Sequence, residues 1–301
     1  MMQRSELARR SFRQLLAAPG IIVLPGIYDG VSALLAQSAG FDAVHMSGYG
    51  VSASLIGEPD VGLATQTEMV DRAARLTAVL DIPLIADADT GYGGILNVRR
   101  TVREYERAGV AGLHLEDQLT PKRCGLMDGK QLIPRSDMAE KLRAAVLARE
   151  DPALVLIART DARSVTGLAD ALERAKIYVE AGADAIFIEA PHSEDEIHQI
   201  ATELHPTPFL HNMATLDSRD GAPPVVDAAL LEDWGYKMVL FPLQALYAAA
   251  HAMMELFGEL KGHHKLQKAR HATVTSADFD RVMKLQELLG FERRCVAPVR
   301  N

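Results

Sequence analysis

The chain has 301 residues, of which 48% are hydrophobic and 24% charged, and its formal net charge at pH 7 is -8. This length is enough to bury one large core or two ordinary ones. The acidic balance argues against a nucleic-acid-binding surface and against general attraction to acidic membranes, because both need an excess of basic residues. Small anionic substrates are compatible with it, since a local pocket can oppose the overall charge.

Cysteine content and hydropathy indicate a cytoplasmic protein. The two cysteines, Cys124 and Cys295, are too few for a disulfide framework and lack the spacing of a metal site. The N-terminal residues are mixed in charge and lack the apolar core of a signal peptide. No apolar run approaches the roughly 20 residues of a membrane span. The most apolar helical segment, 243–256, contains two polar residues and is interpreted as a buried or interface helix.

Short apolar strands alternate with helical patterns along most of the chain. We predict strands at 21–25, 43–47, 83–87, 112–116, 153–159, 185–189, 208–212 and 236–241. We predict helices at 7–17, 31–38, 67–79, 97–108, 136–149, 167–181, 193–204 and 222–232, a long helix from 242, and two C-terminal helices at 265–270 and 276–289. Ser136, Ser193 and Ser276 are the expected N-caps of their helices.

Eight strands alternating with helices indicate parallel pairing and favour a (β/α)8 TIM-type barrel. An open, doubly wound sheet is the alternative. We favour the barrel because its strand ends converge on one site. We expect a single domain over 1–301, with the barrel at about 20–258 and a helical extension at about 259–301 that packs on a neighbouring subunit. The polar residues at the predicted carboxyl ends are Ser47, Asp87, His114, Glu116, Arg159, Glu189 and Asn212.

Two acidic residues two positions apart, Asp87 and Asp89, precede a glycine-rich turn. Carboxylate oxygens suit a hard cation, and Mg2+ needs only one or two of them because it keeps several waters. Mn2+ is a possible substitute. The alternative is a turn with solvated aspartates, and Asp60, Glu116 and Glu189 in the same barrel mouth favour the metal.

Strand 112–116 carries His114 and Glu116 on one face. Taken alone, this pair favours a buried core histidine with a salt-bridged glutamate over a functional site. Arg159 ends an apolar strand, where an unpaired charge is costly. It either clamps a substrate carboxylate, which we favour, or pairs with acidic residues when no substrate is bound.

The segment Lys122-Arg123-Cys124-Gly125 places a thiol between cations, which predicts a lowered pKa and a poised nucleophile or general acid. The alternative is an inert loop cysteine, and we assign that alternative to Cys295.

The order of these motifs resembles the isocitrate lyase/phosphoenolpyruvate mutase superfamily, over about residues 20–215. The resemblance is greatest to the branch of 2-methylisocitrate lyase, dimethylmalate lyase and oxaloacetate hydrolase. The matching pieces are Leu24-Pro-Gly26, Ser47-Gly-Tyr-Gly-Val-Ser52, Gly57-Glu-Pro-Asp60, Ala86-Asp-Ala-Asp89, His114-Leu-Glu-Asp-Gln118, Pro121-Lys-Arg-Cys-Gly125, Ala158-Arg-Thr-Asp-Ala162 and Ile188-Glu-Ala190.

The resemblance implies a barrel whose last helix is swapped between subunits, in a homotetramer. It implies Mg2+ held by Asp87 and Asp89, with Asp60, His114 and Glu116 close by through waters. It also implies a mobile loop around Cys124 that closes over a small 2-hydroxy or 2-oxo acid. The substrate-binding residues implied by it are Ser47, Gly48, Tyr49, Arg159, Glu189, Asn212, Lys122, Arg123 and Gly125.

The implied reaction is Mg2+-dependent cleavage of the C2–C3 bond of a malate-like 2-hydroxy di- or tricarboxylate. Its products are a 2-oxo acid and a carboxylate, with Cys124 protonating the carbanion. Tyr49 and Glu116 are both candidates for the base that takes the hydroxyl proton. Leu126 stands where the lyases usually carry histidine, and Tyr49 stands where many members have a small residue. Both differences count against the standard 2-methylisocitrate substrate, and the resemblance at Ser47-Gly-Tyr49 and Thr65-Gln-Thr-Glu68 favours the 2,3-dimethylmalate type.

Two alternatives to the lyase reaction stay open. One is an oxaloacetate decarboxylase or hydrolase, or a carboxyphosphonoenolpyruvate mutase, on the same metal site. The other is a non-catalytic binding protein that has kept the pocket, which the full set of acidic residues disfavours.

Overall fold

The computed structural model describes residues 2–213, 224–263 and 273–296. The chain falls into two compact units, Met1–Leu246 and Tyr247–Asn301. The first unit holds all eight strands. No helix in the described part of the chain is long and apolar enough to cross a membrane.

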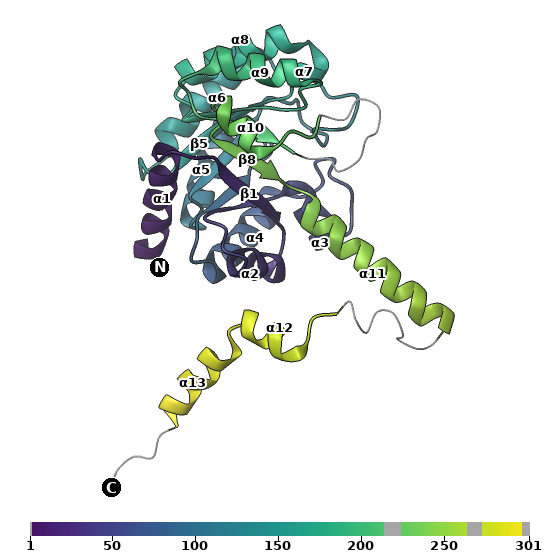
Figure 1. Ribbon diagram of the computed structural model, residues 1–301. Helices are drawn as coiled ribbons and strands as arrows, with labels where there is room; N and C mark the ends of the chain where they lie inside the picture. The colour runs from purple at the N-terminus through teal and green to yellow at the C-terminus, as the bar shows by residue number, and fades with distance from the viewer. Residues whose placement is uncertain (1, 214–223, 264–272, 297–301) are drawn as a thin grey trace. The chain divides into compact units, whose positions relative to one another are not determined.

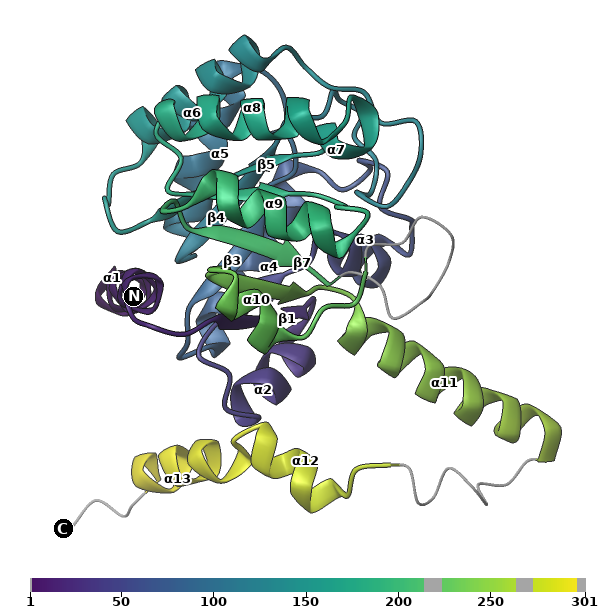
Figure 2. The same ribbon diagram turned by 45° about the horizontal axis from the view of Figure 1, so that its top comes forward.

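Eight parallel strands close into a barrel in the order of the sequence, with β8 paired to β1. This confirms the (β/α)8 prediction over the open sheet, and the helices lie around the outside of the strands (Figure 1 and Figure 2). The strands are β1 (Ile22–Ile27), β2 (Val44–Met46), β3 (Leu84–Asp87), β4 (Gly112–Glu116), β5 (Val155–Thr160), β6 (Ala185–Ile188), β7 (Phe209–Asn212) and β8 (Met238–Phe241).

The helices surround this barrel in the first unit and make up the described part of the second. Those of the first unit are α1 (Met2–Ala17), α2 (Gly30–Ser38), α3 (Gly48–Ile56), α4 (Gln66–Val79), α5 (Ile95–Arg107), α6 (Arg135–Ala148), α7 (Ala162–Val165), α8 (Leu168–Glu180), α9 (Glu194–Leu204) and α10 (Ala228–Asp233). α11 (Gln244–His263) begins in the first unit, and α12 (Ser276–Val282) and α13 (Leu285–Cys295) lie in the second.

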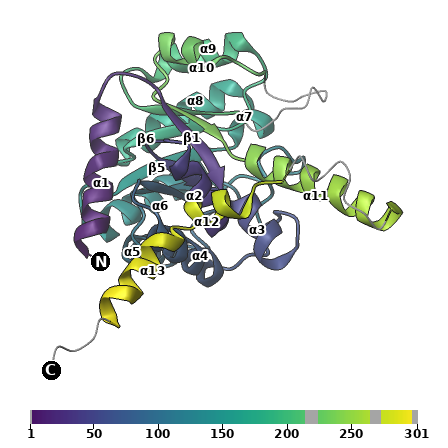
Figure 3. The ribbon, with the colours of Figure 1, turned by 60° about the horizontal axis from the view of Figure 1, so that its bottom comes forward.

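The interior of the barrel is apolar at the amino ends of the strands and polar at their carboxyl ends. Helix α1 lies at the amino ends, where Phe12 is fully buried among the inner strand residues (Figure 3). Because side chains two apart on a strand share a face, the residue two positions after an inner apolar residue also points inward. The strands carry these apolar–polar pairs as Ile85 and Asp87, Ile157 and Arg159, Phe187 and Glu189, and Leu210 and Asn212.

Several helix boundaries differ from the prediction. Helix α3, which directly follows β2, was not predicted, and it begins at Gly48 because Ser47 Oγ accepts from the Gly50 N–H and caps it. Helix α10 begins only at Ala228, since Asp227 is the cap and the prolyl nitrogen of Pro224 has no N–H to donate. Residues 222–223 of that predicted helix, and the predicted helix at 265–270, lie outside the described residues.

The predicted caps are partly correct. Ser193 caps α9 as expected, accepting a hydrogen bond from the N–H of Glu196. Ser136 lies inside α6, which starts after Pro134, a residue whose fixed φ suits the entry to a helix. Thr275, not Ser276, caps α12.

A buried carboxylate joins the barrel to its outer helices just behind β4. Asp117 is fully buried, and its oxygens accept hydrogen bonds from the Thr160 hydroxyl at 2.7 Å and the Tyr178 hydroxyl at 2.8 Å. They also accept from Arg174 at 3.1 Å and from the backbone N–H of Asp161 at 3.0 Å. The four donors come from β5, α8 and the residue that follows β5, so one side chain fixes the position of the barrel wall beside the site.

The Asp117→Ala variant should lose about 3–5 kcal/mol of unfolding free energy, because it leaves the buried Arg174 without this partner. Equilibrium urea denaturation measures the loss. The matched control is Asp71→Ala, which breaks the exposed ion pair with Arg75 at 2.8 Å and should cost less than about 1 kcal/mol. Equal losses in the two variants would contradict the structural role of Asp117.

Candidate active site

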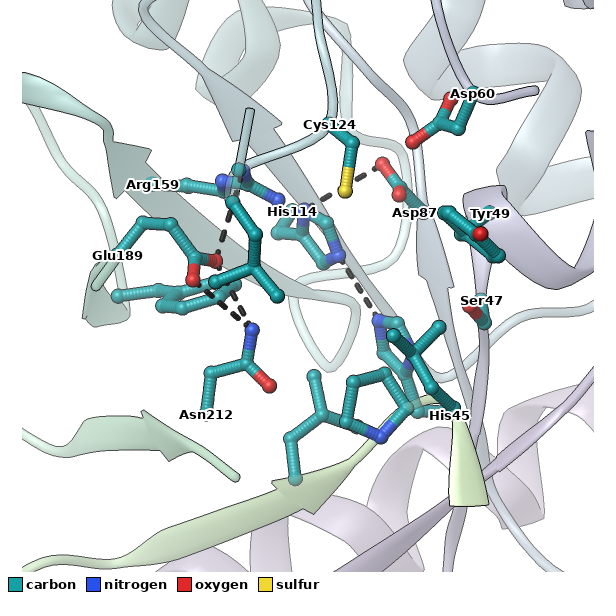
Figure 4. A pocket seen from close by; sticks show the side chains of 16 residues that line it. His45, Ser47, Tyr49, Asp60, Asp87, His114, Cys124, Arg159, Glu189 and Asn212 are labelled. Atoms are coloured by element: carbon teal, nitrogen blue, oxygen red, sulfur yellow. Dashed lines mark hydrogen bonds and ion pairs between the residues drawn. The ribbon is translucent and has the colours of Figure 1, made fainter. Parts of the chain in front are cut away.

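A pocket opens at the carboxyl ends of the strands, where the polar inner residues meet (Figure 4). Side chains from β2, β3, β4, β5 and β7 point into it, and the loop that carries Cys124 lies over it. The lining residues are His45, Ser47, Tyr49, Asp60, Asp87, His114, Cys124, Gly125, Leu126, Arg159, Phe187, Glu189, Asn212, Leu240, Pro242 and Leu243.

Most of the predicted site residues are brought together here. Gly48, Asp89, Glu116 and Lys122 do not line the pocket but contact residues that do. Gly48 lies so close to the Asp87 carboxylate that an added Cβ would overlap an oxygen atom. Its glycine identity is therefore required by the approach of α3 to β3.

Arg123 is the exception among the predicted site residues. Its side chain is exposed, and its guanidinium donates to the backbone oxygen of Asp128 at 3.0 Å. The prediction that it binds substrate is not supported by this position, because the loop turns it away from the pocket while Lys122 turns inward.

Four buried acidic side chains lie around the Lys122 ammonium. Its Nζ is 2.5 Å from Asp60 Oδ1 and 2.7 Å from Asp89 Oδ1. Burial and the neighbouring carboxylates of Asp87 and Asp60 raise the pKa of Asp89 to about 6. Burial also raises the pKa of Glu116 well above its ordinary value, and Glu116 Oε1 has no hydrogen-bond partner among the described residues. The acidic side chains of this cluster outnumber the cations beside them, and burial among like charges is what raises the pKa values of Asp89 and Glu116.

This donor set fits a divalent cation. Asp87 and Asp89 supply hard carboxylate oxygens, and the partnerless oxygen of Glu116 is available to a further ligand or a water. In the part of the chain that the structure describes, no three His, Cys, Asp or Glu side chains converge on one ion position. A site that draws on one or two carboxylates and several waters is compatible with that arrangement, and Mg2+ prefers such sites.

Arg159 is held by three carboxylates. Its Nε and a terminal nitrogen donate to Asp161 at 2.9 and 3.0 Å, which is a bidentate pair. Glu116 lies 3.4 Å and Glu189 3.5 Å away, and the guanidinium sits 5.1 Å from the centre of the Phe187 ring. Of the two partners that the sequence allowed for Arg159, a substrate carboxylate or acidic side chains of the protein, the structure shows the acidic side chains. Asp161 was not predicted as a site residue, although it follows Arg159 at the two-residue spacing of a shared strand face.

Glu189 and Asn212 form the wall opposite β2. The Asn212 amide nitrogen donates to both oxygens of Glu189, at 3.1 and 3.0 Å. Gly125 of the loop lies against this wall, because an added Cβ would come within 2.7 Å of the Glu189 side chain. The loop thus closes on the pocket through its backbone.

Cys124 points into the pocket between Arg159 and Asp60 (Figure 4). Burial of the thiol raises its pKa to about 11, which corrects the prediction of a lowered pKa. The physical reason is that the flanking cations do not face the sulfur: Lys122 is paired with acidic side chains and Arg123 is turned to solvent. The side chain is therefore a protonated thiol at neutral pH, which suits a proton donor better than a nucleophile.

Sequence reasoning missed two further residues. Lys130 is buried, and its ammonium contacts Asp161 Oδ1 at 3.0 Å and the backbone oxygen of Gly125, which ties the loop to β5. His45 lies on β2, with its Nε2 2.9 Å from His114 Nε2. Its position two residues before Ser47, on the same strand face, was the available signal. For Lys130, which follows a loop of polar residues, the sequence offered none.

Comparisons with known proteins show the family to which this chain belongs. The family model described as phosphoenolpyruvate phosphomutase matches residues 12–261. The chain is 44% identical to the 2,3-dimethylmalate lyase of Eubacterium barkeri over 280 residues, covering 93% of this chain and 95% of that protein. It is 45% identical to the 2-methylisocitrate lyase of Bacillus subtilis (strain 168) over 268 residues, covering 89% and 86%.

Solved structures give the same result. A crystal structure of 2,3-dimethylmalate lyase superposes with a TM-score of 0.89 at 38% identity and covers 96% of both chains. Oxaloacetate acetylhydrolase in complex with 3,3-difluorooxalacetate superposes with a TM-score of 0.90 at 33% identity, covering 97% of this chain and 98% of the other. With its closed barrel, its cluster of buried carboxylates and its loop cysteine, this chain belongs to the isocitrate lyase/phosphoenolpyruvate mutase superfamily.

Proposed function

We propose that this carbon–carbon lyase is Mg2+-dependent and cleaves the C2–C3 bond of a malate-like 2-hydroxy acid, releasing a 2-oxo acid and a carboxylate. Relatives named as 2,3-dimethylmalate lyase and 2-methylisocitrate lyase support the reaction class. The observation that carries the proposal is the protonated thiol of Cys124 opposite a cluster of buried carboxylates and Arg159 in one pocket.

The substrate's oxo-acid end would lie between β2 and β5. Ser47 and the backbone at Gly48 and Tyr49 offer hydrogen-bond donors, and Arg159 offers a guanidinium for the C1 carboxylate. To reach it, a substrate carboxylate would replace some of the contacts of Arg159 with Glu116 and Glu189, which at 3.4 and 3.5 Å are longer than the bidentate pair with Asp161. Asp161 would keep the guanidinium in place throughout.

Asp87 and Asp89 would hold Mg2+, for which Mn2+ can substitute, with Asp60, His114 and Glu116 close by. When bound, the metal stabilises negative charge on the C2 oxygen. A neighbouring structure, phosphonopyruvate hydrolase at 26% identity and a TM-score of 0.86, was determined as a complex with oxalate and Mg++. That pairing supports the assignment of a metal to the acidic end of the present pocket.

The chain's own groups would move two protons. Either Tyr49 or Glu116 takes the proton from the C2 hydroxyl. Cys124 donates a proton to the carbanion that leaves with C3, and the loop that carries it excludes water from the reacting atoms. Lys122 and Lys130 hold this loop closed through their contacts with Asp60 and Asp161.

The Cys124→Ser variant should lose lyase turnover by about 100-fold or more, since a serine hydroxyl is a much weaker acid than the thiol. Oxo-acid release from 2,3-dimethylmalate, 2-methylisocitrate and isocitrate with Mg2+, detected as the hydrazone, measures turnover. Binding of Mg2+ and of oxo acid should change little. Cys295→Ser is the matched control, because Cys295 is exposed and lies in the second unit. Near-normal turnover by Cys124→Ser would refute the assigned acid.

Charge and shape in the pocket favour a dicarboxylate. Among the described residues that line it, Arg159 is the only one with a fixed positive charge, and three acidic side chains already surround it. Lys122 lies near the pocket, but its ammonium is paired with Asp60 and Asp89. A third carboxylate would enter without a partner, whereas alkyl groups on C3 would contact the apolar rim formed by Leu126, Leu240, Pro242 and Leu243.

Leu126→His should shift the preference toward 2-methylisocitrate over 2,3-dimethylmalate by roughly 10-fold in kcat/KM, because the imidazole supplies a charge-assisted donor for the third carboxylate. The ratio of kcat/KM for the two substrates measures the shift, which should grow as the pH falls through the pKa of the new histidine. Leu126→Met keeps the volume and apolar character and should leave the ratio unchanged. No change in the histidine variant would place the selectivity elsewhere.

A second candidate activity is the hydrolysis or decarboxylation of oxaloacetate. It is favoured by the likeness to oxaloacetate acetylhydrolase, whereas the relative named carboxyvinyl-carboxyphosphonate phosphorylmutase in Arabidopsis thaliana, at 39% identity, favours a phosphonomutase-type reaction in the same pocket. Oxaloacetate and phosphonopyruvate therefore belong in the same assay. Turnover of oxaloacetate alone that persists in Cys124→Ser would favour chemistry at the carboxylate cluster without the thiol.

We propose a homotetramer with helices exchanged between subunits. The second unit supports it: α12 and α13 have no buried residues in the described chain, and large apolar side chains of this unit are exposed. Sedimentation velocity should give a species of four chains, and a monomer at micromolar concentration would contradict the proposal. The exposed side chains are Tyr247, Met253, Met254, Phe257, Leu260, Val274, Phe279, Leu288, Phe291 and Val296.

A further inference from the structure

Two histidines face each other at the floor of the pocket, beneath the residues assigned above. His45 on β2 and His114 on β4 are 2% and 1% exposed, and their Nε2 atoms are 2.9 Å apart (Figure 4). The rings are nearly parallel, with an interplanar angle of 4° and centroids 5.1 Å apart. The contact is of hydrogen-bond length, so it needs an N–H on one ring and a bare nitrogen on the other.

The 2.9 Å contact cannot form between two charged rings, because each ring would then present an N–H to the other. Both rings are almost fully buried, and burial favours the neutral form of an imidazole. Two protons are then shared among four ring nitrogens. One proton lies in the contact between the two Nε2 atoms. The other is on Nδ1 of the ring whose Nε2 accepts that hydrogen bond.

The direction of this hydrogen bond is set by the two outer nitrogens. Both Nδ1 atoms are buried and have no hydrogen-bond partner among the described residues, but His114 Nδ1 lies 3.7 Å from Asp87 Oδ1. If His114 donated, its bare Nδ1 would face the carboxylate and repel it, and the remaining N–H would lie on His45 Nδ1. If His45 donates, the remaining N–H lies on His114 Nδ1, where the carboxylate oxygen attracts it although the distance exceeds that of a hydrogen bond. The second direction is therefore electrostatically favoured.

We propose that His45 is a positioning residue: its Nε2–H donates to His114 Nε2 and thereby holds the His114 Nδ1–H toward the carboxylate of Asp87. The chain of contacts runs from β2 through β4 to β3 and ends on a carboxylate to which the proposed function assigns the metal, so the inference rests on that assignment. Groups that orient a metal-binding carboxylate or imidazole in this way control metal affinity without contacting the ion. His45 therefore acts on the reaction through His114 and Asp87.

The test compares two substitutions that separate the donor from the ring. His45→Phe keeps an aromatic ring against His114 and removes the N–H, whereas His45→Gln places an amide N–H near the position of Nε2. With Mn2+ alone as the probe and no substrate, titration followed by electron paramagnetic resonance should show roughly 10- to 100-fold weaker binding in His45→Phe. His45→Gln should recover most of that affinity.

Two further variants keep the outcomes distinct. His211→Phe alters another buried histidine, 1% exposed on β7 and outside the pocket lining, and should leave Mn2+ affinity unchanged. Asp87→Asn tests the assignment on which the inference rests. If the unsubstituted protein binds no Mn2+, or Asp87→Asn binds it equally well, the metal assignment is wrong. If binding depends on Asp87 but His45→Phe equals the unsubstituted protein, or His45→Gln is as weak as His45→Phe, the role of His45 is refuted.

Neutron diffraction from crystals of the unsubstituted protein exchanged into D2O keeps the proposal testable if a variant does not fold. Deuterium on His45 Nε2 and on His114 Nδ1 is the expected result. Deuterium on His114 Nε2 would reverse the direction of the hydrogen bond and overturn the proposal.

Discussion

The pocket depends on the pairing of buried charged side chains inside the closed barrel. Arg159 projects from β5 among Asp161, Glu116 and Glu189, and each of these carboxylates is buried. An unpaired charge here would cost several kcal/mol, and a paired one costs much less. The guanidinium and the acidic side chains therefore hold one another in place, and a substrate anion can enter only by taking over part of this pairing.

Ion pairs with buried carboxylates also hold the loop over the pocket. Lys122 reaches down to Asp60 and Asp89, and Lys130 reaches Asp161 and the backbone of Gly125. Both ammonium groups are directed at carboxylates rather than at Cys124, and burial keeps its thiol protonated although Arg159 lies nearby. The loop thus supplies a neutral proton donor because its lysines are paired with carboxylates and not with the thiol.

A second consequence concerns which substrates the pocket suits. One wall is polar, made by the carboxylates, Arg159 and Asn212, and the rim beside the loop is apolar. A dicarboxylate with alkyl groups matches both halves, with its oxo-acid end on the polar wall. The histidine pair lies below this boundary, where it contacts Asp87 rather than the substrate's apolar end.

The barrel, its strands and the polar residues at the strand ends could be predicted from the sequence, because alternation and strand-end polarity are local patterns that a closed parallel sheet must bring together. Asp87, His114 and Arg159 were expected at one barrel mouth for that reason. What each charged group faces is a property of the folded chain and could not be predicted from local patterns. The direction of Lys122, and with it the state of the Cys124 thiol, depends on Asp60 and Asp89, which are distant in sequence. The contact of His45 with His114 spans β3, so no local pattern could show it.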